Sequence, residues 1–134
     1  MLNTTMSTAA VNAEADALAS LLGSGFIDIY DGEQPEDADV PVSTQNHIVR
    51  LMFSATAFAK AKNGALTANA IAAGVALVTA QATWFRASRK DGVPVFDGSV
   101  GDAEANMVLP TTMIVARQTV SCTRFTHTIA KVRR

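Results

Sequence analysis

A hairpin signal in the second half of the chain restricts the folds that this sequence can adopt. In the stretch Gln81–Gly101, QATWFRASRKDGVPVFDGSVG, the pair Asp91-Gly92 separates two strand-forming runs. Glycine accepts the positive φ of a tight turn, so Asp-Gly between such runs predicts a β-hairpin. Trp84 and Phe85 are adjacent, and neighbours on a strand point to opposite faces of a sheet. Large aromatic side chains on both faces predict that other parts of the chain pack against both sides of this strand, as in a β-sandwich or small barrel.

Other segments add further short strands to this hairpin. Strand-like runs recur along the chain, among them FIDIY at residues 26–30 and a Thr-rich final run at residues 119–129. Asn63-Gly64 predicts a second hairpin, whereas residues 70–80 fit either a helix or a strand. Pro94 lacks a backbone donor, which places its strand at a sheet edge or at a kink. About eight short strands predict a mainly β domain, a β-sandwich or jelly-roll-like fold.

The two ends of the chain are expected to lie outside this domain. Residues 1–12 lack periodicity and are interpreted as a flexible N-terminal arm. The single β-sandwich domain is predicted to span residues 13–130, with a basic C-terminal tail at 131–134. One short N-terminal helix is expected from Asn12, whose side chain can cap it, to Leu22. The large side chains expected to anchor the core are Trp84, Phe85, Phe53 and Phe125.

Charge is distributed unevenly along a chain whose formal net charge is only −1. Residues 1–49 hold eight acidic and no basic residues, whereas residues 50–134 hold four acidic and eleven basic ones, so the halves carry −8 and +7. Either the acidic part folds against the basic part, or unlike ends of neighbouring copies meet. The second interpretation predicts assembly contacts at Glu33, Glu36, Asp37, Asp39, Arg133 and Arg134.

Chemically reactive residues are few, and none falls in a familiar catalytic or metal-binding motif. Clustered acids at residues 28–39 could bind Ca²⁺, but their spacing does not match an EF-hand loop. His47, His127 and Cys122 are too few for a zinc site and are interpreted as ordinary strand residues. The near-zero net charge gives no attraction to nucleic acid or acidic membranes. We therefore expect no enzymatic activity, no metal, no cofactor and no nucleic-acid partner.

The sequence also carries no export signal. Its first ten residues lack the charged and apolar regions of a signal peptide. The longest apolar run, Ala70–Val78, is far shorter than the ~20 residues that span a bilayer. Cys122 is the single cysteine, so no intrachain disulfide can form. These features predict a protein that is made in a cytoplasm and is not secreted.

Four blocks of the sequence carry a resemblance to a known family: LASLLGSGFIDIYDGEQPEDAD, FSATAFAKAKNGALTANAI, ATWFRASRKDGVPVFDGSVG and the Thr-rich final strand. With these blocks the chain resembles small structural (virion) proteins of tailed bacteriophages and prophages. Most of the likeness lies in the run Trp84-Phe85-Arg86 and in the residues that follow Ile29-Tyr30, which are Gly32, Gln34, Pro35, Ala38 and Asp39. The matching blocks are motifs that form the fold and not an active site, so the resemblance identifies no catalytic residue in this chain.

This resemblance implies a non-enzymatic virion component that contacts other virion proteins and copies of itself. It implies first a capsid decoration or cement protein, a minor capsid protein whose N-terminal arm reaches its neighbours. Two alternatives stay open: a head–tail connector or tail or baseplate component, and a carbohydrate- or receptor-binding β-sandwich of a fibre. A fibre domain of that kind needs surface aromatic residues, and the chain has one Trp and one Tyr.

Overall fold

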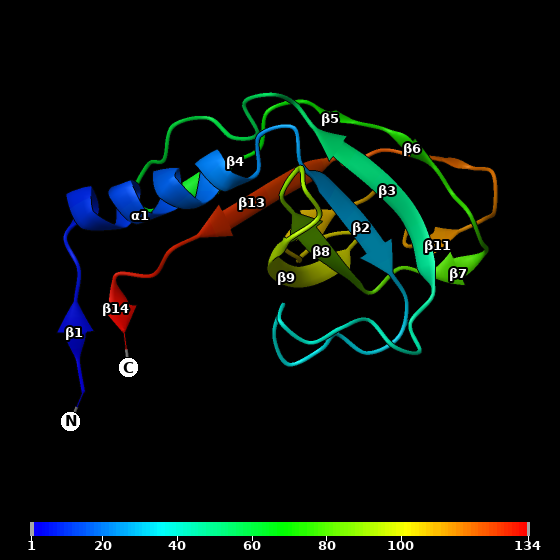
Figure 1. Ribbon diagram of the computed structural model, residues 1–134, viewed down its shortest axis with the longest axis horizontal. Coiled ribbons are helices and arrows are strands. Elements are labelled where there is room, and N and C mark those ends of the chain that lie inside the picture. The colour runs from blue at the N-terminus through cyan, green and yellow to red at the C-terminus, as the bar shows by residue number, and fades with distance from the viewer. Residues whose placement is uncertain (1, 134) are drawn as a thin grey trace.

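The computed structural model describes residues 2–133 and shows a curled β-sheet with one helix packed against it (Figure 1). The helix, α1, spans Thr8–Leu21. The strands, in chain order, are β1 (Thr4–Thr5), β2 (Phe26–Tyr30), β3 (His47–Phe53), β4 (Ala65–Thr67), β5 (Ile71–Ala72), β6 (Gly74–Val75), β7 (Ala80–Gln81), β8 (Trp84–Ser88), β9 (Pro94–Gly101), β10 (Met107–Val108), β11 (Met113–Ile114), β12 (Thr119–Val120), β13 (Arg124–Thr128) and β14 (Val132–Arg133).

Eight of these strands form the principal sheet, in the order β4-β13-β10-β9-β8-β2-β3-β5. Its first and last strands, β4 and β5, follow each other in the chain with only residues 68–70 between them. The sheet must therefore curl until its two ends approach. Phe53 of β3 and Phe125 of β13 then meet edge to face, with 5.9 Å between ring centroids. The prediction of a mainly β, sandwich-like domain is confirmed.

The predicted central hairpin forms β8 and β9, with Gly92 at φ +89° in the turn. On its other side β8 pairs with β2, so every residue of β8 is buried. β9 lies between β8 and β10, but it pairs with β10 only at Val100 and Gly101, so its Pro94 end pairs on one side alone. Pro94 lies opposite Ser88, where the pairing register shifts. The prediction of an edge or a kink at Pro94 is therefore confirmed.

The core lies on the concave side of the sheet, where Phe85 packs. The four predicted anchors are all buried, with exposed fractions of 0% for Trp84, 1% for Phe85, 4% for Phe53 and 2% for Phe125. The Phe85 and Phe125 rings lie 5.0 Å apart, which joins neighbouring parts of the curled sheet. Trp84 points to the opposite face and stacks on Tyr30 at 4.6 Å. The prediction that β8 is covered on both faces therefore holds.

The helix begins earlier than the sequence suggested. Ser7 is its N-cap, and the Ser7 hydroxyl accepts a hydrogen bond from the Ala10 N–H at 3.0 Å. Asn12, the expected cap, lies inside α1, and its side chain accepts the Gly64 N–H at 2.7 Å. Val11 is fully buried, so the first turns of α1 belong to the folded domain.

Residues 4–6 and 131–133 pair with each other, which corrects the predicted flexible arm at 1–12 and separate tail at 131–134 as far as the described residues reach. Strands β1 and β14 pair in antiparallel fashion, with Thr4 opposite Arg133 and Thr5 opposite Val132. The Met6 N–H extends this pairing by donating to the Lys131 carbonyl at 2.7 Å. We call the pair β1–β14 the terminal ribbon; it projects from the body at the N-terminal end of α1 (Figure 1).

Three further segments can be compared with what the sequence predicted. The hairpin at Asn63-Gly64 is confirmed, since both residues have positive φ and Lys62 pairs with Ala65. Residues 70–80 form the short strands β5 and β6 and the start of β7 rather than a helix. The Thr-rich final run, expected as one strand, divides into β12 and β13.

Candidate interaction surfaces

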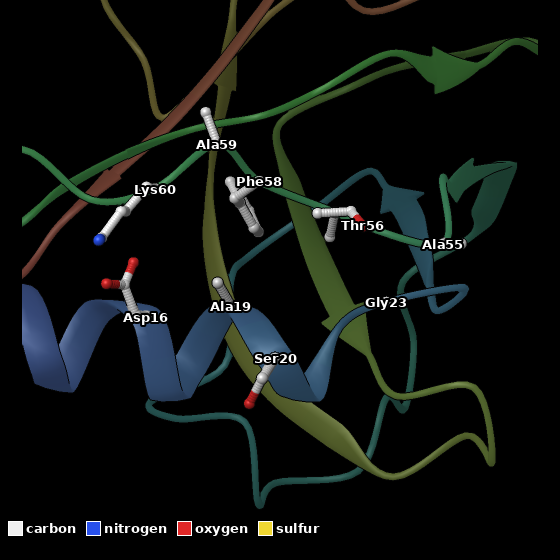
Figure 2. A pocket seen from close by; sticks show the side chains of 10 residues that line it. Asp16, Ala19, Ser20, Gly23, Ala55, Thr56, Phe58, Ala59 and Lys60 are labelled. Carbon is white, nitrogen blue, oxygen red and sulfur yellow. The ribbon is translucent and has the colours of Figure 1, made fainter.

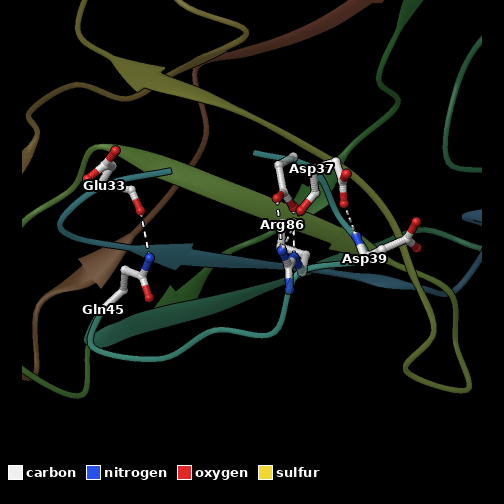
Figure 3. Close-up of polar contacts among 6 residues, drawn as sticks. Glu33, Asp37, Asp39, Gln45 and Arg86 are labelled. Atoms are coloured by element: carbon white, nitrogen blue, oxygen red, sulfur yellow. Dashed lines mark hydrogen bonds and ion pairs between the residues drawn. The ribbon is translucent and has the colours of Figure 1, made fainter. Parts of the chain in front are cut away.

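The acidic loop, residues 31–46 between β2 and β3, folds over the Trp84 side of the sheet. The Trp84 Nε1–H donates to the Asp31 carbonyl at 2.9 Å, and the Thr83 hydroxyl donates to the Gly32 carbonyl at 2.7 Å. Farther along, the Arg86 guanidinium reaches the Asp37 carbonyl at 3.4 Å (Figure 3). These bonds fix the backbone of the loop to the sheet, so its side chains are presented from a defined position.

Four predicted contact residues lie on this loop with exposed side chains: Glu33, Glu36, Asp37 and Asp39. No ion pair involves any of them within residues 2–133. Their local bonds are internal to the loop: Gln45 donates to the Glu33 carbonyl at 2.6 Å, and Asp37 accepts the Asp39 N–H at 2.8 Å (Figure 3). The loop therefore presents negative charge to solvent that the rest of the described chain leaves unneutralised.

The basic residues predicted as counterparts lie elsewhere. Arg133 belongs to the terminal ribbon and forms an ion pair with Glu14 of α1 at 2.8 Å. Arg134 lies outside the described residues. Within one chain the structure thus does not bring Arg133 to the acidic loop. A meeting of the two between neighbouring copies stays a prediction.

Beneath the loop lies a layer of paired charges, with buried carboxylates and a half-exposed Arg50, that the sequence did not reveal. Arg50 binds the Asp28 carboxylate with two hydrogen bonds of 2.8 and 3.0 Å, and His47 Nε2 lies 3.0 Å from the same carboxylate. Burial by itself raises the Asp28 pKa, but the contacts of His47 and Arg50 outweigh it and leave that pKa below its usual value. The alternation of Phe26, Asp28 and Tyr30 on one strand face was the available signal.

A second pair, in which both partners are buried, completes this layer. Arg86 binds Asp97 with hydrogen bonds of 2.7 and 2.9 Å, and their side chains are only 8% and 3% exposed. The Asp97 contact raises the Arg86 pKa further above its already high value, against the opposing effect of burial. Because Arg86 also holds the Asp37 carbonyl, the pair links the sheet to the acidic loop. We therefore interpret the layer as the support of the loop.

His127 and Cys122 lie at partly buried positions. His127 stacks on Phe96 with 4.4 Å between centroids, and burial lowers its pKa. Burial raises the pKa of the Cys122 thiol to about 11, so the thiol is protonated at neutral pH and is a poor nucleophile. Among residues 2–133, no three His, Cys, Asp or Glu side chains come together as metal ligands would.

An apolar surface lies at the end of the molecule opposite the terminal ribbon (Figure 1). Segments 74–81 and 113–120 run antiparallel there through the pairs β6–β12 and β7–β11. Alternate residues such as Ala76 and Ile114 are buried, while the others face solvent. The exposed members, which we call the apolar end, are Val75 (60%), Leu77 (63%), Met113 (52%) and Val115 (55%).

The sequence around the apolar end contains very little charge. Between Lys62 and Arg86 there is no Asp, Glu, Lys or Arg, and between Glu104 and Arg124 the single charged residue is Arg117. Free sheet edges in soluble proteins usually carry charged side chains that discourage pairing with other chains. These charge-free stretches were the signal in the sequence that pointed to the apolar end.

A groove runs beside the second half of α1. Its volume is about 360 Å³, and its walls are the second half of α1 and the extended segment 55–60 (Figure 2). Asp16 and Lys60 point toward each other at one end of it (Figure 2). Ser20 and Thr56, also in its walls, are exposed, whereas Phe58 is only 4% exposed and closes its floor.

Comparisons with known proteins do not assign the chain to a family. No family model matches it, and neither a curated protein nor a solved structure shows significant similarity. No helix within residues 2–133 combines the length and apolar character that crossing a membrane requires.

Proposed function

We propose that this protein is a structural subunit of a bacteriophage particle, and that it acts as a capsid decoration or cement protein. The observation that carries the proposal is the apolar end. It leaves Val75, Leu77, Met113 and Val115 more than half exposed, with Arg117 as the single charged residue in the two segments that carry them, and exposed apolar surfaces of this kind often mark interaction sites. The resemblance of the sequence to virion proteins of tailed phages supports a virion protein as the partner at this site.

The acidic loop supports the same proposal from another side of the molecule. Its four exposed acids have no cationic partner within residues 2–133, although the sheet holds their backbone in place. A fixed negative surface guides the approach of a basic partner and sets its orientation more than it adds affinity. The apolar end would then provide the adhesion and the acidic loop the orientation.

The alternative of a carbohydrate-binding fibre domain is less favoured. Such a site needs exposed aromatic rings, but the single Trp and single Tyr of the chain, Trp84 and Tyr30, are 0% and 8% exposed. Each ring is stacked on the other beneath the acidic loop. A neck or tail position remains the second candidate, because the apolar end would serve there equally well.

Counting this protein in purified particles tests the proposal. A copy number comparable with that of the major capsid protein supports decoration, a few copies per particle supports the neck or tail, and absence from particles refutes a structural role. A second experiment assigns the surface. Leu77→Lys and Met113→Lys should abolish incorporation, whereas Val93→Lys, at an exposed aliphatic residue (48%) of the hairpin, should not. Equal incorporation of all three variants would exclude the apolar end as the docking surface.

A further inference from the structure

A single charged side chain, that of Arg117, belongs to the two segments that carry the apolar end. The Arg117 N–H donates to the Ala76 carbonyl at 2.8 Å, so its backbone lies beside the Ala76–Leu77 peptide, and Val115 comes two residues before it. Arg117 is exposed and forms no ion pair with any carboxylate within residues 2–133. The one charge of this surface is therefore unneutralised by the described part of its own chain.

The turn that carries Arg117 is fixed by hydrogen bonds. The Gln118 N–H donates to the Val115 carbonyl at 3.0 Å, and the Val115 N–H donates to the Gln118 side chain, also at 3.0 Å. The Ala116 N–H donates to the Thr79 hydroxyl of the neighbouring segment at 2.9 Å. With the Arg117 bond described above, all four N–H groups of the turn are used. A backbone that is already ordered loses little freedom on binding, which favours the use of this turn in recognition.

The backbone of Arg117 is left-handed, with φ +73°. This conformation is unfavourable for a residue that has a Cβ atom, whereas glycine adopts it freely. The chain has glycine in the same conformation at Gly92, in the turn of the central hairpin. An arginine at such a position retains strain that glycine would relieve, and strained residues cluster at functional sites. The backbone thus also indicates a role for the guanidinium.

Burial of the apolar end imposes a condition on its partner. A surface that covers Leu77 and Val115 also removes water from Arg117, because the three residues are neighbours on the same turn and strand pair. A buried guanidinium without a counter-ion is strongly unfavourable. Its forked N–H donors match the two oxygens of a carboxylate in a bidentate pair. A purely apolar partner would therefore be rejected, whereas one with a carboxylate at this place would be accepted.

We propose that the surface covering the apolar end presents a carboxylate among apolar side chains, and that Arg117 binds this carboxylate and thereby selects the partner. The inference rests on the proposed function, since it names the chemistry of the surface on which the apolar end docks. Aliphatic contacts adhere to many apolar surfaces, but an ion pair between them fixes one register and excludes partners that lack it. Arginine is also enriched among the residues that dominate binding at interfaces.

Co-expression of variants with the natural chain during particle assembly tests the proposal. Mass spectrometry gives the ratio of variant to natural chain in purified particles and in the lysate that produced them. Arg117→Met keeps a long side chain without its charge and should be depleted from particles by about tenfold or more. Arg117→Lys keeps the charge without the fork and should be depleted less. Lys90→Met, at an exposed lysine of the β8–β9 turn, is the matched control and should incorporate like the natural chain.

Arg117→Met gives opposite results for the two kinds of partner. On a surface with a carboxylate it leaves that carboxylate buried and unpaired, whereas on a purely apolar surface it should be enriched. A second variant, Arg117→Gly, removes the side chain and suits the left-handed backbone, so it should melt no lower than the natural chain and still be depleted. Misfolding is thereby excluded as the cause of a loss.

The same assay separates this inference from the proposed function. Incorporation of Arg117→Met or Arg117→Gly at or above the natural level, with Leu77→Lys excluded from particles, would overturn the selection by Arg117 alone. Natural incorporation of Leu77→Lys would remove the docking role of the apolar end and this inference with it. Absence of the natural chain from particles would refute both the inference and the proposed function.

Discussion

Replacing Trp84 by alanine tests whether the sheet and the acidic loop form one cooperative unit. Trp84 is fully buried, its ring stacks on Tyr30 at 4.6 Å, and its Nε1–H donates to the Asp31 carbonyl at 2.9 Å. Loss of the buried ring, together with the cavity it leaves, costs about 3–5 kcal/mol. Since small domains are stable by roughly 5–15 kcal/mol, we expect Trp84→Ala to be folded only marginally.

Urea denaturation followed by far-UV circular dichroism measures this loss. Trp84 is the only tryptophan, so intrinsic tryptophan fluorescence cannot report on the variant. Trp84→Phe keeps an aromatic ring against Tyr30 but removes the donor to Asp31, and we expect an intermediate loss of about 1–3 kcal/mol. Val93→Ala, at an exposed residue, should change stability by less than about 0.5 kcal/mol. A loss below about 1 kcal/mol for Trp84→Ala would refute the role of this residue as an anchor.

Three further predictions follow from buried groups. Arg86→Met leaves the buried Asp97 without its counter-ion and should lower the free energy of unfolding, measured by urea denaturation, by about 3–5 kcal/mol. The double variant with Asp97→Leu should recover much of this loss. A loss below about 1 kcal/mol for the single variant would contradict the prediction. Burial lowers the His127 pKa, so its contribution to stability is present above the unfolded pKa of about 6.5 and is lost as pH falls below it. His127→Phe should therefore reduce the fall in unfolding free energy between about pH 7 and pH 5, and an unchanged slope would count against the assignment. Gly98→Ala would bring a Cβ within 2.5 Å of the Phe85 ring and should cost about 1–3 kcal/mol, so an unchanged melting temperature would show that the ring can move.

The parts of the fold that the sequence predicted are those specified by local chemistry. Asp91-Gly92 and Asn63-Gly64 specify turns through backbone conformation alone, and both hairpins are present. Trp84 and Phe85 are large enough that burial on both faces of one strand could be inferred from their adjacency. Such signals need no knowledge of which distant segment packs against them.

The errors arose where a distant partner decides the outcome. Residues 4–5 carry no pattern of their own and are ordered because Val132 and Arg133 pair with them. The start of α1 was placed too late because Ser7 and Asn12 are both good caps, and the bond from Gly64 to Asn12 decides between them.

The candidate surfaces were predicted only in part. The exposed acids of the loop were identified from charge, but the fixed backbone that presents them depends on Trp84 and Arg86. The apolar end was overlooked because Val75, Leu77 and Met113 have the composition of a core, and composition does not reveal which side of a ribbon faces solvent. The groove arises from segments more than thirty residues apart and has no local signature.

The position of β13 in the sheet has a consequence for the order of folding. This strand is near the end of the 134 residues, yet it lies between β4 and β10 and contributes Phe125 to the core. During synthesis β4 therefore emerges long before the strand that it must pair with. Contacts so distant in sequence form slowly, because a long loop has to close before they can form. Until β13 arrives, Phe53 and Phe85 lack the ring that covers them, so the growing chain should expose aromatic surface and depend on chaperones.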